Sequence, residues 1–336
     1  MIRHPVLLAA CALLIAAAPI AEAKKAKAAP AIDLATPEGA TLAGRKIQCS
    51  AVDNVPVIYT FHGEAFSRVP GERDRKLFNV EGMNVRQCVT VTDPARGTGW
   101  RLVSRELLLY VDPATGELLR EWKNPWSGQT VKVLQTANDP VNQRPVFPVG
   151  ADGKPTQWPG TINGDNWWNT ITVPLFYSNP LAGDYQKNIG GFYHATEMFN
   201  FFGKVADLTD PRNPNPRIEV GWVRMADWLP WMEMSGRAGI IYMHAAGRKV
   251  DSYDQLPAVM RKTIETEYPE YRNPPPGDDQ RPNETSWTYF KKKFPAGQAP
   301  APAQKLPPTG GRGPSPPVRL LRRAAGSSID HPKPHF

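Results

Sequence analysis

The chain has 336 residues, of which 41% are hydrophobic, and a formal net charge of +8. The charge lies at the ends, since residues 1–30 contribute +3 and residues 296–336 contribute +5, and residues 31–295 therefore sum to zero. A basic protein usually suggests a nucleic-acid partner, but the central part offers no net positive field for phosphate. We therefore expect no nucleic-acid partner.

The first residues have the pattern of a secretory signal peptide. Arg3 precedes a mostly apolar stretch that ends in the small-x-small sequence AEA, which is typical of a cleaved leader. We predict a signal peptide over residues 1–23, cleavage after Ala23, and a flexible linker over 24–40. A lipoprotein box ending at Cys11 is the less favoured alternative, because few apolar residues precede it.

The remaining chain contains no stretch of the roughly 18 apolar residues that a membrane span needs. We therefore predict a periplasmic or secreted protein with no transmembrane segment in the mature chain. The tail, residues 296–336, is basic, rich in Pro, Gly and Ala, and poor in aromatic residues. Such a composition buries too little apolar area to offset the entropy of ordering, so we expect this tail to be disordered.

Between residues 40 and 252, short segments rich in β-branched and aromatic residues end at Asn-Pro or Asp-Pro pairs. Asn and Asp start turns through their side chains, and proline fixes the next backbone angle. Breaks at intervals of roughly 10 to 15 residues suit antiparallel strands. The clearest hairpin joins 100–111 to 117–122 through the turn 112–116. Further strands are expected at 56–68, 77–92, 130–137, 168–177, 217–225 and 238–246.

Two segments instead place apolar residues at helical spacing. Residues 193–208 put Met198 and Phe202 on one face of a helix, and residues 252–271 repeat the pattern. Together with the strands, they predict a single, mainly β domain over 41–295. Its expected form is a large curved antiparallel sheet or a lipocalin-like (calycin-like) barrel with one or two short helices.

Two cysteines, Cys49 and Cys88, remain after the leader. An isolated pair in an oxidising compartment is a candidate disulfide, and two buried thiols on neighbouring strands are the alternative. Neither cysteine belongs to a CxxC motif or has metal-type partners beside it.

Several motifs give the chain a family resemblance. These are FNVEGMNVRQC, SRELLLYVDPATGELLREWKNPWSGQTVKV, NDPVN, PLFYSNPL, VGWVRMADWLPWMEM and GIIYMHAAGRKV. In this order, from about residue 75 to residue 275, they resemble a bacterial family of unknown function, DUF1838. The resemblance implies no activity, because none is established for the family.

Aromatic side chains are concentrated over residues 158–242, which hold 15 of them in 85 positions. Ligand pockets combine apolar walls with a few placed polar groups, so this region is a candidate for the wall of a pocket. The alternative is that these side chains form a solid aromatic core. Within this region ADWLPWMEMSGRAG, residues 226–239, lies between two predicted strands and is expected to plug the mouth of the sheet. The candidate ligand-binding residues are Trp222, Arg224, Trp228, Trp231, Asn138, Asp139, Asn142, Arg105, Glu106 and Tyr110.

Some of these candidates have a structural alternative. An inward-facing Arg224 can bind a ligand carboxylate or pair with an internal acid, and ANDPVN can form a ligand-binding rim or an ordinary Asx turn. Arg105 and Glu106 are neighbours on a strand, so only one of them points inward.

His194 and Glu197 are the weak candidates for catalysis. At positions i and i+3 of a helix they would share a face, and a His–carboxylate pair titrates near neutral pH. A surface hydrogen bond is the alternative. A zinc site would need a third ligand from His62 or His244, and we predict neither a metal nor a cofactor.

The sequence therefore predicts an exported protein of unknown activity that binds an apolar or aromatic small molecule in a β-barrel cavity. The first alternative is an enzyme, an isomerase, cyclase or hydrolase, that uses acid–base chemistry of His194 and Glu197. The second is a structural protein with a filled aromatic core. Oligomeric state is left open.

Overall fold

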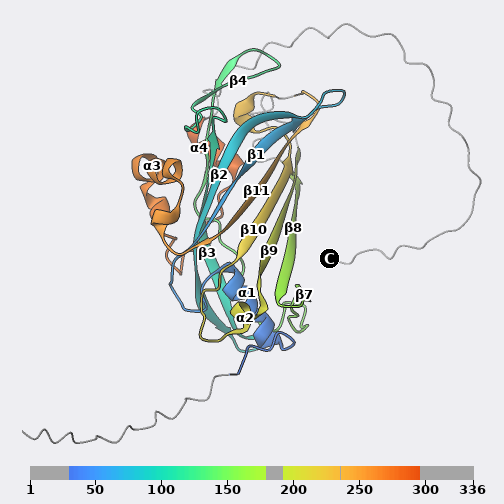
Figure 1. Cartoon of the computed structure of the whole chain (residues 1–336), viewed down its shortest axis with the longest axis vertical. Helices are drawn as coiled ribbons and strands as arrows, with labels where there is room; N and C mark the ends of the chain where they lie inside the picture. The colour runs from blue at the N-terminus through green and yellow to red at the C-terminus, as the bar shows by residue number, and fades with distance from the viewer. Residues whose placement is uncertain (1–29, 179–191, 235, 296–336) are drawn as a thin grey trace, which may run out of the picture.

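The computed structural model describes residues 30–178, 192–234 and 236–295. Within them, one antiparallel sheet has the strand order β6-β3-β2-β1-β11-β10-β9-β8-β7 (Figure 1). A two-stranded ribbon, β4–β5, stands apart from it. The strands are β1 (Val57–Arg68), β2 (Arg75–Asp93), β3 (Gly97–Val111), β4 (Glu121–Lys123), β5 (Thr130–Lys132), β6 (Thr136–Asn138), β7 (Thr161–Asn163), β8 (Asn166–Ser178), β9 (Phe192–Lys204), β10 (Glu219–Ala226) and β11 (Ile240–Val250).

The helices are short and lie around this sheet. Because β1 pairs with β11, strands from the two ends of the domain meet in the middle of the sheet. The helical elements are α1 (Pro37–Gln48), α2 (Val205–Thr209), η1 (Pro230–Met232), η2 (Tyr253–Gln255), α3 (Ala258–Glu267), η3 (Pro269–Arg272) and α4 (Ser286–Lys293).

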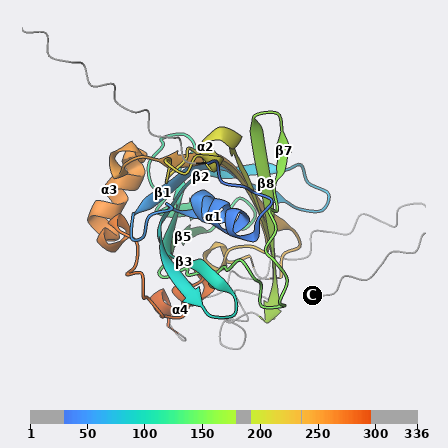
Figure 2. The same cartoon turned by 90° about the horizontal axis from the view of Figure 1, so that it is seen from below.

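The sheet has a concave and a convex face, to which successive side chains of each strand point alternately. The register aligns Tyr59 with Asn84 and Asn84 with Glu106, so these three side chains share the concave face. The sheet curves around α1, whereas α3 lies outside the curve (Figure 2). On the convex face Met260 of α3 is buried in a cluster with Met83 of the sheet.

The two ends of the concave interior are closed by different segments. At one end α1 and α2 lie beside the sheet, and the β4 ribbon lies at the other (Figure 1). Ile47 of α1 is buried in a cluster with Val57 and Trp167. At the opposite end Trp231 of η1 is buried in a larger cluster, which also contains Phe78.

Helix α1 is fixed at its start by local sequence. The Thr36 side chain accepts a hydrogen bond from Gly39 N at 3.1 Å, and proline occupies the first helical position. Both features favour a helix N-terminus, because the threonine satisfies an otherwise unpaired N–H and proline has none to satisfy.

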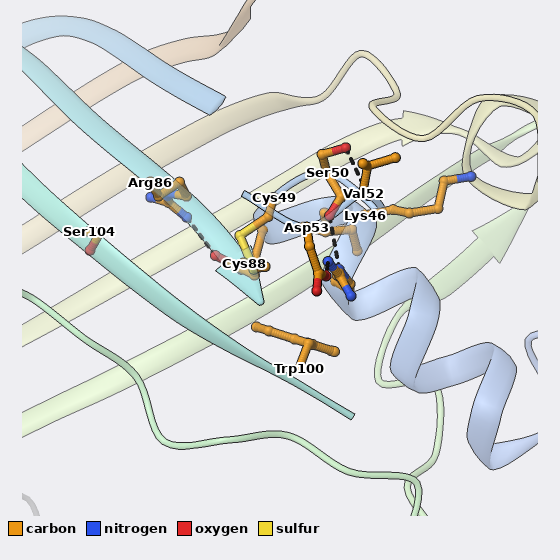
Figure 3. The surroundings of a disulfide bond; sticks show 12 residues. Lys46, Cys49, Ser50, Val52, Asp53, Arg86, Cys88, Trp100 and Ser104 are labelled. Carbon is orange, nitrogen blue, oxygen red and sulfur yellow. Dashed lines mark hydrogen bonds and ion pairs between the residues drawn. A yellow bond between two sulfur atoms is a disulfide. The ribbon is translucent and has the colours of Figure 1, made fainter. Parts of the chain in front are cut away.

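The far end of α1 is fixed by tertiary bonds (Figure 3). Cys49, the C-cap residue, forms a disulfide with Cys88 of β2, and both cysteines are fully buried beside Trp100. Lys249 of β11 donates to Lys46 O at 2.6 Å and to Cys49 O at 2.8 Å. These bonds satisfy carbonyl groups that a helix C-terminus leaves unpaired.

The predicted mainly antiparallel β fold is confirmed, and the turn predicted at 112–116 is present. The hairpin predicted there is reduced to an isolated bridge between Val111 and Leu118, because residues 121–123 pair with β5 and not with β3. There the Asp112 side chain accepts hydrogen bonds from Ala114 N and Thr115 N, and Gly116 has a φ of 74°. The described strands form one open order from β6 to β7, so they confirm the curved sheet without closing it into a barrel. The helix expected over 252–271 is confirmed as α3 with its flanking turns.

The helix predicted over 193–208 is wrong for most of its length. Residues 192–204 form β9, which pairs with β8 on one side and β10 on the other, and only α2 is helical. The burial of Tyr193 and Ala195, with exposed His194 between them, shows the two-residue period of a strand. Pairing along both edges outweighs the apolar spacing that suggested a helix.

The remaining predictions concern the two ends of the chain. Helix α1 begins inside the segment 24–40 that was expected to be a linker, because a cap and a proline start it there. The segment predicted as a signal peptide, 1–23, and the tail predicted to be disordered, 296–336, lie outside the described residues. No helix in the described part of the chain is long and apolar enough to cross a membrane.

Candidate functional site

A cavity of about 90 Å³ lies on the concave face, lined by residues of β1, β2, β3, β6, β9 and β10. Phe61, Phe199 and Trp222 give it aromatic walls, and the rings of Phe61 and Trp222 lie 5.3 Å apart. The cavity combines these apolar walls with several polar side chains, as ligand pockets generally do.

One polar group of the cavity is built around Arg224 of β10. Its Nη1 donates to Glu197 Oε1 at 2.6 Å, and its Nη2 donates to the hydroxyl of Tyr193. The register makes Arg224 and Glu197 direct cross-strand partners, and their side chains are only 16% and 18% exposed. The pair is therefore held rigidly, and its charges are largely shielded from solvent.

A second polar group faces it from β2 and β3. Asn84 Nδ2 donates to Glu106 Oε1 at 2.9 Å, and Arg86 Nε donates to Asn84 Oδ1 at 2.5 Å. Arg86 also donates to Gln48 Oε1 at 2.6 Å. A chain of hydrogen bonds thus runs from the end of α1 to Glu106 and fixes the direction of that carboxyl group.

The Glu106 carboxyl has an unusual protonation equilibrium. Burial raises its pKa to about 7, and the negative charge of Glu197 adds to this effect, against the opposing influence of Arg86, Arg224 and Asn84. Glu106 keeps some surface on the cavity, so the carboxyl can meet a bound molecule. At neutral pH it is present in both its charged and its neutral form.

Two polar atoms on side chains that line the cavity have no hydrogen-bond partner within the described part of the chain. These are Arg224 Nε, a donor, and Asn138 Oδ1, an acceptor. Asn138 is 8% exposed. Leaving such a group buried and unpaired costs about 1–3 kcal/mol, so a ligand that supplies one acceptor and one donor would recover this free energy.

The structure brings four of the predicted ligand-binding residues together at this cavity: Trp222, Arg224, Asn138 and Glu106. Glu197, predicted as a catalytic candidate, joins them. Of the two neighbours on β3, Glu106 is the one that points inward.

Three of the other predicted residues lie outside the cavity lining. Arg105 Nε lies 3.0 Å from Asp139 Oδ1, and its Nη1 donates to the Asn273 carbonyl at 2.6 Å. Asn142 Oδ1 accepts a hydrogen bond from Ser104 N at 3.3 Å. These polar groups hold the segment after η3 and the chain around Asp139 in place.

The predicted plug occupies one end of the interior. Trp228 is 7% exposed and Trp231 is 4% exposed. The Trp231 ring lies 5.4 Å from the ring of Tyr110 and 5.9 Å from that of Phe78. Trp228, Trp231 and Tyr110 therefore serve as packed core beside the cavity, not as its lining.

His194 and Glu197 do not form the predicted pair. They lie three positions apart on a strand, so they point to opposite faces. His194 is 59% exposed and its Nδ1 lies 3.0 Å from Asp227 Oδ2. His62, considered as a third zinc ligand, is paired with Glu81, and its Nδ1 lies 2.7 Å from Glu81 Oε1. Among the described residues, no three His, Cys, Asp or Glu side chains converge to hold a metal ion.

Sequence reasoning missed three polar residues of the site: Asn84, Arg86 and Tyr193. The first two occupy alternate positions of FNVEGMNVRQC, a strand in which polar and apolar residues are mixed. Polar side chains at a two-residue spacing within such a strand are a signal for a polar patch on one buried face.

The family model for DUF1838, described as a protein of unknown function, matches residues 54–294. The chain belongs to this family. No curated protein matches the sequence. The DUF1838 match spans every strand of the sheet and both polar groups of the cavity, and the family description supplies no activity for them.

Proposed function

We propose that this DUF1838 protein binds a small molecule with an aromatic or apolar body and one polar end in the concave cavity. The observation that carries the proposal is the pairing of aromatic walls with two unpaired polar atoms, Arg224 Nε and Asn138 Oδ1. An apolar body would lie against Phe61, Phe199 and Trp222, while the polar end satisfies these two atoms.

The cavity size limits the ligand. A volume of about 90 Å³ holds about three water molecules, and it is below the roughly 150 Å³ of a cavity that takes up benzene and the roughly 300 Å³ at which drug-sized sites begin. A small ring compound therefore enters with a small outward movement of the lining side chains. A curved antiparallel sheet that holds a ligand on its inner face resembles the arrangement in lipocalin-like barrels. This likeness of shape supports the proposal.

We also propose that the protein works in the periplasm or outside the cell. The leader-like sequence of residues 1–23 supports export. The buried Cys49–Cys88 disulfide is consistent with this, because disulfides persist in oxidising compartments.

Benzamide is a suitable probe because its carbonyl can accept from Arg224 Nε and its amide N–H can donate to Asn138 Oδ1. We expect saturable binding at one site by isothermal titration calorimetry. The variant Leu108→Phe places a larger side chain in the cavity lining, takes up part of the cavity volume and should lower the affinity for benzamide at least tenfold. Met225→Phe, on the exposed convex face of β10, is the matched control and should bind as the wild type does.

Two results would contradict the proposal: an absence of benzamide binding to the full chain, or equal weakening by both variants. Native mass spectrometry of protein purified from its own cells gives an independent test. A retained small molecule should appear in the wild type and be depleted in Leu108→Phe.

A further inference from the structure

We propose that the cavity is a proton-transfer site in which Glu106 exchanges a proton with a small carbonyl compound whose oxygen accepts a hydrogen bond from Arg224 Nε. This inference rests on the proposed function and adds a reaction class to it, the isomerisation of a ketone through its enolate. Its basis is the placement of a carboxyl group, an unpaired cationic donor and aromatic walls around one small cavity.

Arg224 is positioned to stabilise negative charge on an oxygen atom. Glu197 and Tyr193 occupy its two terminal nitrogens, which leaves Nε as the donor without a protein partner. The guanidinium group cannot rotate away without breaking both bonds. A fixed donor in a site shielded from water stabilises a developing oxyanion strongly, because it needs no reorganisation during the reaction.

Glu106 is positioned to take up and return a proton. Asn84 holds its Oε1 at 2.9 Å, and Arg86 holds Asn84 in turn. Burial and the charge of Glu197 bring the pKa of Glu106 to about 7, the range in which one group serves as both base and acid at neutral pH. The ion pair to Arg224 at 2.6 Å gives Glu197 the separate task of holding the cation.

The reaction balances without a further reagent. The charged Glu106 carboxylate removes a proton from the carbon next to the carbonyl, so that the C–H bond breaks and an O–H bond forms on Glu106. The C–H electron pair becomes a C=C bond, and the carbonyl π electrons move to the oxygen, beside Arg224 Nε. Glu106 then returns the proton to a different carbon, which gives an isomer and restores the carboxylate.

The test uses cyclohex-3-en-1-one, whose isomerisation to cyclohex-2-en-1-one is followed by the ultraviolet absorbance of the conjugated product. In deuterium oxide, exchange at the carbon next to the carbonyl is followed by proton NMR. We expect both to exceed the buffer rate, and kcat/KM to rise with an inflection near pH 7 as Glu106 ionises. Glu106→Gln should lower kcat/KM about 100-fold or more while benzamide still binds.

The matched control is Glu64→Gln, on the exposed convex face of β1, which should retain the full rate. If benzamide binds but cyclohexenone neither isomerises nor exchanges faster than in buffer, proton transfer is overturned and the binding function stands. If benzamide does not bind, both fail. A rate that survives Glu106→Gln overturns the role of Glu106. Should Glu106→Gln not fold, a wild-type pH profile without an inflection between pH 6 and 8 overturns it as well.

Discussion

The two ends of the concave interior are closed in physically different ways. At the η1 end, Trp231 packs among the rings of Phe78, Tyr110 and Trp122, and the closure is mainly apolar. At the α1 end, a disulfide and lysine–carbonyl hydrogen bonds join one helix to the sheet. The cavity lies between them, linked to α1 through Arg86 and Gln48.

This difference shows what aromatic density does and does not indicate. The η1 end and the cavity are both rich in aromatic residues, but the first is packed solid. The second contains a cavity, and the polar side chains around it are hydrogen-bonded to one another. The solid-core alternative therefore describes one end of the molecule but not its centre.

The largest expected effect comes from removing the central ring of the η1 end. Trp231→Ala should lower the free energy of unfolding by about 4–5 kcal/mol, since it leaves a large cavity in a fully packed cluster. Denaturant unfolding followed by circular dichroism measures this loss. A loss below about 1 kcal/mol would show that the η1 end is not tightly packed.

Removing the covalent link at the α1 end should have a slightly smaller effect. The disulfide joins residues 39 positions apart, and the double variant Cys49→Ser with Cys88→Ser should lose about 3–4 kcal/mol, mainly because the unfolded chain becomes freer. Unfolding midpoints of the two proteins give the comparison. Benzamide affinity should also fall, because Gln48 at the end of α1 helps to orient Arg86. An unchanged affinity would show that α1 does not influence binding in the cavity.

The smallest of the three effects lies in the cavity and appears only as a pH dependence. The pKa of Glu106 is raised in the folded protein to about 7 from an ordinary value of 4.5. The folded state therefore holds this proton more tightly than the unfolded state. The stabilisation is complete below about pH 4.5 and is lost as the pH rises through 7.

We expect the loss to be about 2 kcal/mol, because Glu106 is only partly buried and solvent screening reduces the full effect of the pKa shift. It is measured as the difference in unfolding free energy between wild type and Glu106→Gln at pH values from 4.5 to 8. Parallel curves for the two proteins would mean that Glu106 has an ordinary pKa and is solvated.

Much of the fold could be predicted from local patterns. The turn at 112–116 was predictable because Asp-Pro and Gly determine it within five residues. The identity of β9 was not, since its apolar residues also fit a helix and only pairing with β8 and β10 decides between the two. Helix α1 is short, and what anchors its C-terminus lies on β2 and β11, far away in the sequence.

The candidate site could likewise be predicted only where it depends on local sequence. Trp222, Arg224 and Glu106 were candidates because polar or aromatic groups stood out on predicted strands, and Asn138 was one because it belongs to the polar ANDPVN segment at a strand end. Asn84 and Tyr193 come from neighbouring strands. Register places Asn84 opposite Glu106, and the long Arg224 side chain reaches the Tyr193 hydroxyl. His194 does not pair with Glu197, because the two lie three positions apart on a strand and therefore point to opposite faces.

The sequence by itself determined the β-rich composition, the turns and the apolar positions, because these depend on residues close together in the chain. The resemblance to the DUF1838 family was also evident from sequence motifs alone. Only the tertiary structure decided which aromatic residues pack solid and which line a cavity. It also decided which of two adjacent residues, Arg105 or Glu106, faces inward. Curvature and strand register fix these outcomes, and both arise from pairings between segments far apart in the sequence.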